Sequence, residues 1–208
     1  MTPSIFSLPR AVLPMAAAVL LVTACQTATD EPTGGPTTRV ATAAGHDHAG
    51  SNAALTSDRM HAIAKVREAT ARFHDVEEAI RAGYVVQFPA GCAASPDGAQ
   101  GFHYLNPVLA ADAVIDPLTP ELLMYEPSPA GRLELVGVDY VIPYSVLPAN
   151  TRPKPTVLGV DMMNNDPLGV WALHIWSRRP NAAGMFAAWN AKVSCEHAAV
   201  AKLPELPQ

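Results

Sequence analysis

Four polar side chains stand where the surrounding residues favour buried β-strands. His103 lies in Gly-Phe-His-Tyr-Leu, Glu126 ends Leu-Leu-Met-Tyr-Glu, Asp139 interrupts Val-Gly-Val-Asp-Tyr-Val-Ile, and His174 lies in Trp-Ala-Leu-His-Ile-Trp. A carboxylate is costly to bury alone, so Asp139 is expected to have a partner, and imidazole is a natural one. Two histidines with one or two carboxylates on neighbouring strands suit a divalent transition metal such as zinc, copper or iron. The four residues are therefore candidate metal ligands.

The same residues also permit simpler interpretations. A histidine on a strand is more often a hydrogen-bonded core residue than a ligand, and each histidine taken alone is better explained in that way. Asp139 could face water at a sheet edge or beside a bulge at Gly137, and Glu126 adjoins a turn. The spacing is non-local, and no compact ligand motif such as His-Glu-x-x-His is present. A shared site therefore requires that the fold bring distant strands together.

Sequence motifs of several enzyme classes are absent. The chain has no Gly-x-Ser-x-Gly elbow, no phosphate-binding glycine-rich loop and no dinucleotide fingerprint. The formal net charge is −5 and no cluster of lysine and arginine occurs, so nucleic acid is a poor partner. No catalytic residue can be named from these patterns.

The elements that must position the four side chains are predicted from hydrophobic periodicity. A capping signal near residue 57, an apolar stripe at three- and four-residue steps, and a stop at Gly83 predict one long amphipathic helix. Short apolar runs then predict strands over 84–88, 101–105, 121–126, 132–142, 156–162, 170–177 and 191–195, with a loop over 90–100. We expect an α+β fold, in which a long N-terminal amphipathic helix covers an antiparallel sheet with proline-rich loops.

The first 24 residues are typical of a signal peptide. Arg10 precedes an apolar run at 11–22, which is too short to cross a bilayer comfortably. The sequence Val22-Thr23-Ala24-Cys25 is similar to the bacterial lipobox, whose cysteine is acylated and begins the mature chain. We therefore predict a lipid anchor at Cys25; the alternative is an ordinary secretory peptide with a chance cysteine.

Residues 25–57 are rich in Thr, Ala, Gly and Pro and have few large apolar groups, which favours a flexible membrane tether. His46-Asp47-His48 in this segment could hold a transition metal loosely. The predicted organisation is a lipoprotein signal peptide at 1–24, a tether at 25–57 and a single α+β domain at 58–208.

Cys92 and Cys195 remain once Cys25 carries lipid. The leader implies an oxidising compartment, where such a pair most simply forms a disulfide. The closed loop of about 100 residues would stabilise the fold by roughly 4–5 kcal/mol in the chain-entropy model. A reactive thiol or a metal–thiolate site is the alternative, although neither cysteine lies in a Cys-x-x-Cys pair.

Several segments carry a family resemblance. They are Gly-Phe-His-Tyr-Leu-Asn at 101–106, Leu-Val-Gly-Val-Asp-Tyr at 135–140, and Leu-His-Ile-Trp at 173–176 followed by Gly-Met-Phe-Ala-Ala-Trp-Asn at 184–190, supported by Ala-Gly-Tyr at 82–84 and Leu-Leu-Met-Tyr-Glu-Pro at 122–127. Over about 71–195 the chain resembles a family of secreted bacterial proteins and lipoproteins without a characterised activity. The resemblance implies secretion and supplies no ligand or reaction.

Together these patterns predict an extracytoplasmic binding domain, lipid-anchored to the bacterial membrane, that holds a transition-metal ion or a small ligand at the His/carboxylate site. One alternative is a metal-assisted enzyme, a hydrolase or an oxygenase, in which Asp139 or Glu126 acts as base. The other is a structural envelope lipoprotein with no ligand. The expected partners are the membrane and a metal ion or small molecule, and no cofactor other than the metal is expected.

Overall fold

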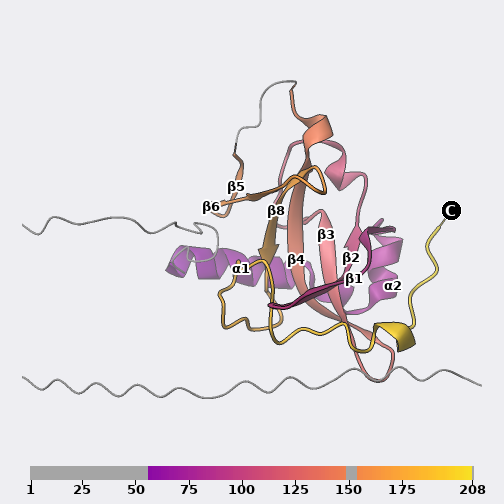
Figure 1. Cartoon of the computed structure of the whole chain (residues 1–208). Coiled ribbons are helices and arrows are strands. Elements are labelled where there is room, and N and C mark those ends of the chain that lie inside the picture. Colours follow the sequence, from indigo (N-terminus) through magenta and orange to yellow (C-terminus); the bar gives the residue numbers. More distant parts are fainter. Residues whose placement is uncertain (1–55, 149–153, 208) are drawn as a thin grey trace, which may run out of the picture. The chain divides into compact units, whose positions relative to one another are not determined.

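A curled antiparallel sheet dominates the computed structural model, which describes residues 56–148 and 154–207 (Figure 1). Six strands pair in the order β1-β2-β3-β4-β8-β7, and every neighbouring pair is antiparallel. Their bounds are β1 (Val86–Ser95), β2 (Gly98–Leu105), β3 (Leu122–Pro127), β4 (Leu133–Pro143), β7 (Met163–Asn165) and β8 (Val170–Ile175). A separate two-stranded sheet pairs β5 (Thr156–Val157) with β6 (Val160–Asp161).

The prediction of one long N-terminal helix was wrong, and with it the expected α+β fold class. The segment divides into the α-helix α1 (Ser57–Ala69), a 3-10 turn η1 (Ala71–His74) and the short helix α2 (Val76–Arg81). At the first break the Thr70 hydroxyl donates to the Val66 carbonyl, 2.7 Å away. At the second, Asp75 has an extended backbone and its carboxylate accepts from the Glu77 amide at 3.0 Å. The Val66 carbonyl thus accepts from both the amide and the hydroxyl of Thr70, and the Asp75 carboxylate caps the beginning of α2. These local hydrogen bonds mark the two bends, although the apolar stripe continues through them.

Several further differences concern the strands, and one is that the predicted strand at 156–162 is divided into β5 and β6, which pair with each other. The predicted loop at 90–100 belongs to a hairpin of β1 and β2, closed where Ser95 pairs with Gly98. Pro89 does not end β1, because the pairing register shifts between Gln87 and Cys92 and the proline lies in this irregular part, where its missing N–H disrupts no ladder. Residues 191–195 form no strand; Asn190 makes an isolated bridge to Ala99.

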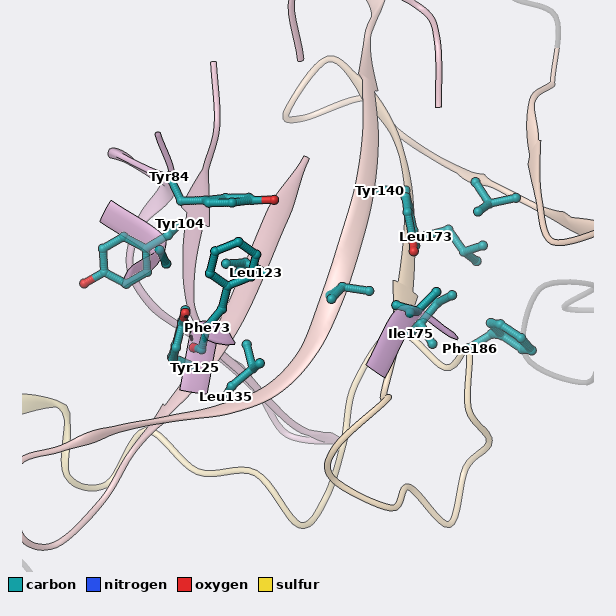
Figure 2. Close-up of a cluster of buried hydrophobic side chains, with 14 of the residues drawn as sticks. Phe73, Tyr84, Tyr104, Leu123, Tyr125, Leu135, Tyr140, Leu173, Ile175 and Phe186 are labelled. Carbon is teal, nitrogen blue, oxygen red and sulfur yellow. Dashed lines mark hydrogen bonds between the residues drawn. The ribbon is translucent and has the colours of Figure 1, made fainter. Parts of the chain in front are cut away.

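The large hydrophobic core lies on the face of the sheet that the helical segments cover. Ile63 and Val66 of α1, together with Phe73 of η1, pack against buried residues of the central strands. Figure 2 shows this cluster, from Tyr104 and Tyr125 at one end to Leu173, Ile175 and Phe186 at the other. The Tyr125 hydroxyl donates to the Phe73 carbonyl at 2.8 Å, so its polar end is satisfied inside the core.

Two smaller apolar clusters occupy the opposite face. One contains Ala99, Met124, Val136, Trp176 and Val193, and the other contains Ala110, Leu122, Val141, Val170 and Ala172. The chain after β8 contributes Trp176 and Val193 to the first cluster. The Trp176 indole donates to the Ala187 carbonyl at 2.7 Å, which holds this segment against the sheet. A disulfide between Cys92 and Cys195 fastens this C-terminal segment to β1.

The predicted signal peptide at 1–24, the lipidation site Cys25 and almost all of the predicted tether lie outside the described residues. Within the part of the chain that the structure describes, no helix combines the length and apolar character needed to cross a bilayer.

Candidate metal centre

Three of the four candidate ligands meet on the second face of the sheet. His103 on β2, Asp139 on β4 and His174 on β8 each offer one ligand atom, and these atoms lie within 4.8 Å of one another. Nε2 of His174 is 3.5 Å from Oδ2 of Asp139, and the centroids of the two imidazole rings are 5.8 Å apart. All three residues are buried, with exposed fractions of 1% for His103, 5% for Asp139 and 6% for His174.

Strand register explains why the three side chains share a face. Asp139 pairs directly with His174, so the two side chains project from neighbouring strands on the same side. His103 pairs with Met124, and Met124 pairs with Gly137, two residues before Asp139. Because side chains alternate along a strand with a period of two, residues at the level of Gly137 and of Asp139 point to the same face.

Curvature of the sheet explains why the side chains are close. Three inter-strand steps separate β2 from β8, which would place the two backbones roughly 14 Å apart in a flat sheet. Between Met124 and Tyr125 the register shifts, since Met124 pairs with Gly137 but Tyr125 pairs with Leu135, leaving Val136 as an extra residue of β4. Such a bulge bends the strand and increases its twist.

Gly137 permits close packing at this bend. A Cβ at this position would lie 2.6 Å from the Ile175 carbonyl oxygen and 2.7 Å from the Met124 terminal methyl group. No side chain fits in that space, so the glycine lets β4 approach β8 closely. It also leaves room for the side chain of Met124, the residue that pairs with His103.

Three polar atoms of the cluster lack hydrogen-bond partners. They are Nδ1 of His103, Nδ1 of His174 and Oδ1 of Asp139. A buried polar atom left without a partner costs about 1–3 kcal/mol, so a bound species that partners all three atoms would stabilise the cluster. Other such atoms, in Trp171, Ser177 and Arg178, are not part of the cluster.

The charge state of His103 suits metal binding. Burial lowers the pKa of this imidazole from 6.5 to about 4, and the nearby Asp139 carboxylate only partly opposes the shift. The ring is therefore neutral near pH 7 and keeps a lone pair for a cation. Two imidazoles and a carboxylate make a nitrogen and oxygen donor set that fits a transition-metal ion.

A small cavity of about 40 Å³ adjoins the cluster. Its walls include the three candidate ligands together with the polar side chains of Gln100 and Asn165. A cavity of this size exceeds the space that one water molecule needs, so it can admit an ion with a small additional donor group.

The fourth candidate, Glu126, lies outside the cluster. Its carboxylate accepts hydrogen bonds from the Arg179 side chain and, at 3.0 Å, from the Ser194 amide. Glu126 is four residues along β3 from Leu122, the residue that pairs with Asp139, and this separation is roughly 13 Å. Its neighbour Arg179, which follows β8, gives the carboxylate a structural role.

Sequence patterns missed one buried acid, Glu121, which directly precedes β3 and is 2% exposed. Burial raises the pKa of its carboxyl group to about 8, and the Val141 amide donates to its Oε2 at 3.3 Å. Its position at the beginning of a strand, next to a proline, is typical of an exposed residue, so only its proximity to an apolar run could have drawn attention to it.

Comparisons of the chain with models of known protein families, with curated proteins and with solved structures found no match. The fold and the site define its class instead: a domain built on a curled antiparallel sheet that carries a buried cluster of two histidines and one aspartate, and this cluster could hold a metal ion.

Proposed function

We propose that this domain binds one divalent transition-metal ion through His103, Asp139 and His174, and that a lipid on Cys25 anchors it to the bacterial membrane outside the cytoplasm. The observation that carries the metal proposal is the convergence of three buried ligand atoms within 4.8 Å, with unpartnered polar atoms on all three residues. Buried groups of this kind normally have partners, and a shared cation would supply one for all three residues.

The donor set favours some metals over others. Calcium and magnesium take oxygen ligands, whereas imidazole suits zinc, copper and iron. Three protein ligands are fewer than the four of a closed structural zinc site, so at least one coordination position would stay open toward the adjoining cavity.

Two features support the extracytoplasmic location. The lipobox-like sequence around Cys25 follows a short apolar run, as in bacterial lipoproteins. The bond between Cys92 and Cys195 is of a kind that persists in oxidising compartments and is rare in the cytosol.

A metal-assisted enzyme is the second candidate, favoured by the cavity beside the cluster. Two histidines and one carboxylate with open positions form the ligand set of non-haem iron oxygenases. In such an enzyme Asp139 would be a ligand, and the placement of Glu126 beside Arg179 gives no support for Glu126 as the base.

Elemental analysis tests the proposed metal site. The full chain, with His46→Ala and His48→Ala to remove the tether histidines, is expected to retain about one equivalent of metal after dialysis. Asp139→Asn and the double change His103→Gln with His174→Gln should retain less than about a tenth of that amount. A matched double change of two exposed histidines, His61→Gln with His74→Gln, should have no effect. Equal metal content in all variants would contradict the proposal, with circular dichroism checking that each variant is folded.

A further inference from the structure

An apolar groove lies beside the cavity of the candidate metal centre. It has a volume of about 430 Å³, and its walls include Leu105 of β2, Val141 of β4 and Val170 of β8. The groove and the cavity adjoin each other, because Phe88, Val141, Leu168 and Val170 line both. Leu168 is 38% exposed, so this large apolar side chain is partly in solvent at the groove.

The two spaces differ in size and polarity. The cavity of about 40 Å³ holds the ligand atoms of His103, Asp139 and His174, and it is too small for a hydrocarbon chain in addition to an ion. The groove lies within the usual size range of small-molecule sites, and its walls are mostly aliphatic and aromatic. A molecule that fills both therefore has a small polar head and an apolar remainder.

The charge of a filled metal site indicates the sign of that head. Imidazole binds a metal ion through a lone pair and adds no charge, so a divalent cation held by two imidazoles and one carboxylate leaves one uncompensated positive charge in a buried place. An isolated buried charge is costly, and an anionic donor in the open coordination position would neutralise it. Carboxylate oxygen is a donor that all the favoured metals accept.

We infer that the site takes a small apolar monocarboxylate, whose carboxylate group completes the coordination of the metal and whose hydrocarbon part lies in the groove formed by Phe88, Val141, Leu168 and Val170. This inference rests on the proposed metal site.

The inference is tested with the full chain loaded with cobalt(II), whose visible absorption spectrum reports its ligands. Sodium octanoate is expected to change the spectrum with saturation, and 1-octanol at equal concentration is not. Each methylene buried in the groove contributes up to about fourfold in affinity, so octanoate should bind at least about thirtyfold more tightly than acetate. Leu168→Ser should weaken octanoate binding at least about threefold and leave acetate binding unchanged.

Leu203→Ser is the matched control, because Leu203 is also a partly exposed leucine, at 44%, and does not line the groove. It should bind octanoate as the unchanged chain does. Failure of the chain to bind cobalt at all would overturn both the metal site and the inference. Cobalt binding with equal affinities for acetate and octanoate, or with no effect of Leu168→Ser, would overturn only the inference and leave the metal site standing.

Discussion

Asp139 and His174 face each other directly across β4 and β8, with Nε2 of the imidazole 3.5 Å from Oδ2 of the carboxylate and with both side chains buried. At 3.5 Å the two groups are at the limit of a hydrogen bond, while the other oxygen of Asp139 and the other nitrogen of His174 have no partner. This pair, with His103 beside it, forms the basis of the proposed metal site.

Metal should stabilise the fold. A ligand that binds only the folded state adds about 2.7 kcal/mol at a concentration one hundred times its Kd. We therefore expect zinc to raise the Tm of the chain and a chelator to reverse the rise, as followed by calorimetry. Asp139→Asn should abolish the response, whereas an undiminished rise in this variant would place the stabilising zinc elsewhere.

His103 should lower the stability of the metal-free protein as the pH falls from about 6.5 to about 4, as measured against the His103→Gln variant. The raised pKa of Glu121 has the opposite effect in both proteins, so the difference between their two curves isolates His103. The pKa of His103 is about 4 in the folded chain, against 6.5 for an unperturbed histidine. Between these values the unfolded chain binds a proton that the folded chain does not, so acidification favours unfolding by up to about 3 kcal/mol. Urea denaturation at a series of pH values gives the free energy of unfolding as a function of pH. This free energy should depend less on pH in His103→Gln than in the unchanged chain, and His61→Gln should match the unchanged chain. Identical curves for His103→Gln and the unchanged chain would be inconsistent with this cause.

An alanine at position 137 should damage the site. Its Cβ would collide with the Ile175 carbonyl and the Met124 methyl group, and overpacking of this kind costs about 1–3 kcal/mol. The bend in β4 would relax, so metal content should fall along with stability. Gly91→Ala is the comparison, because its added Cβ meets nothing within 4 Å and only its left-handed backbone, with φ of 84°, is strained. Retention of a full equivalent of metal by Gly137→Ala would argue against the role of the bulge.

Glu126→Gln should leave metal binding intact and weaken the fold. The carboxylate pairs with Arg179, which is partly buried, so the substitution leaves a cation with a weaker partner. We expect a loss of about 1 kcal/mol in urea denaturation, in view of the partial exposure of Arg179. Loss of metal from this variant would indicate that Glu126 is a metal ligand after all.

Reduction of the disulfide should lower stability substantially. The bond joins positions 103 residues apart, and the chain-entropy model gives roughly 4–5 kcal/mol for such a loop. Replacing both Cys92 and Cys195 with alanine should shift the urea midpoint to the same extent as a reductant does. A reductant that shifts the midpoint of the doubly substituted chain would point to a different cause.

The sequence predicted the members of the cluster better than it predicted their geometry. His103, Asp139 and His174 were identifiable because each is a polar residue in a strongly apolar run. Their closeness depends on the pairing order of four strands, on the extra residue at Val136 and on the missing Cβ of Gly137, and these are non-local properties. Periodicity within a run shows which residues share a face, but it does not show which strands pair or where a bulge falls.

Two other differences between prediction and structure have identifiable causes. Glu126, like Asp139, is a polar residue in an apolar run, but its partner in the structure is Arg179, 53 residues further along the chain. No sequence pattern indicates that these two residues pair. The helix prediction followed the apolar stripe and gave too little weight to Thr70, whose hydroxyl bonds to the Val66 carbonyl, and to Asp75, whose carboxylate caps the beginning of a new helix. Hydrophobic patterning thus predicted which residues face the core and not where the backbone bends.

The most direct measurement is an anomalous difference map from crystals of the zinc-loaded chain, recorded at the zinc absorption edge. A zinc ion held by the three ligands should give one strong peak between β2, β4 and β8, about 2.0–2.2 Å from a nitrogen of His103, a nitrogen of His174 and an oxygen of Asp139. A map with no peak at this position, or with a hydrogen-bonded water bridging the three side chains in its place, would contradict the proposed metal site.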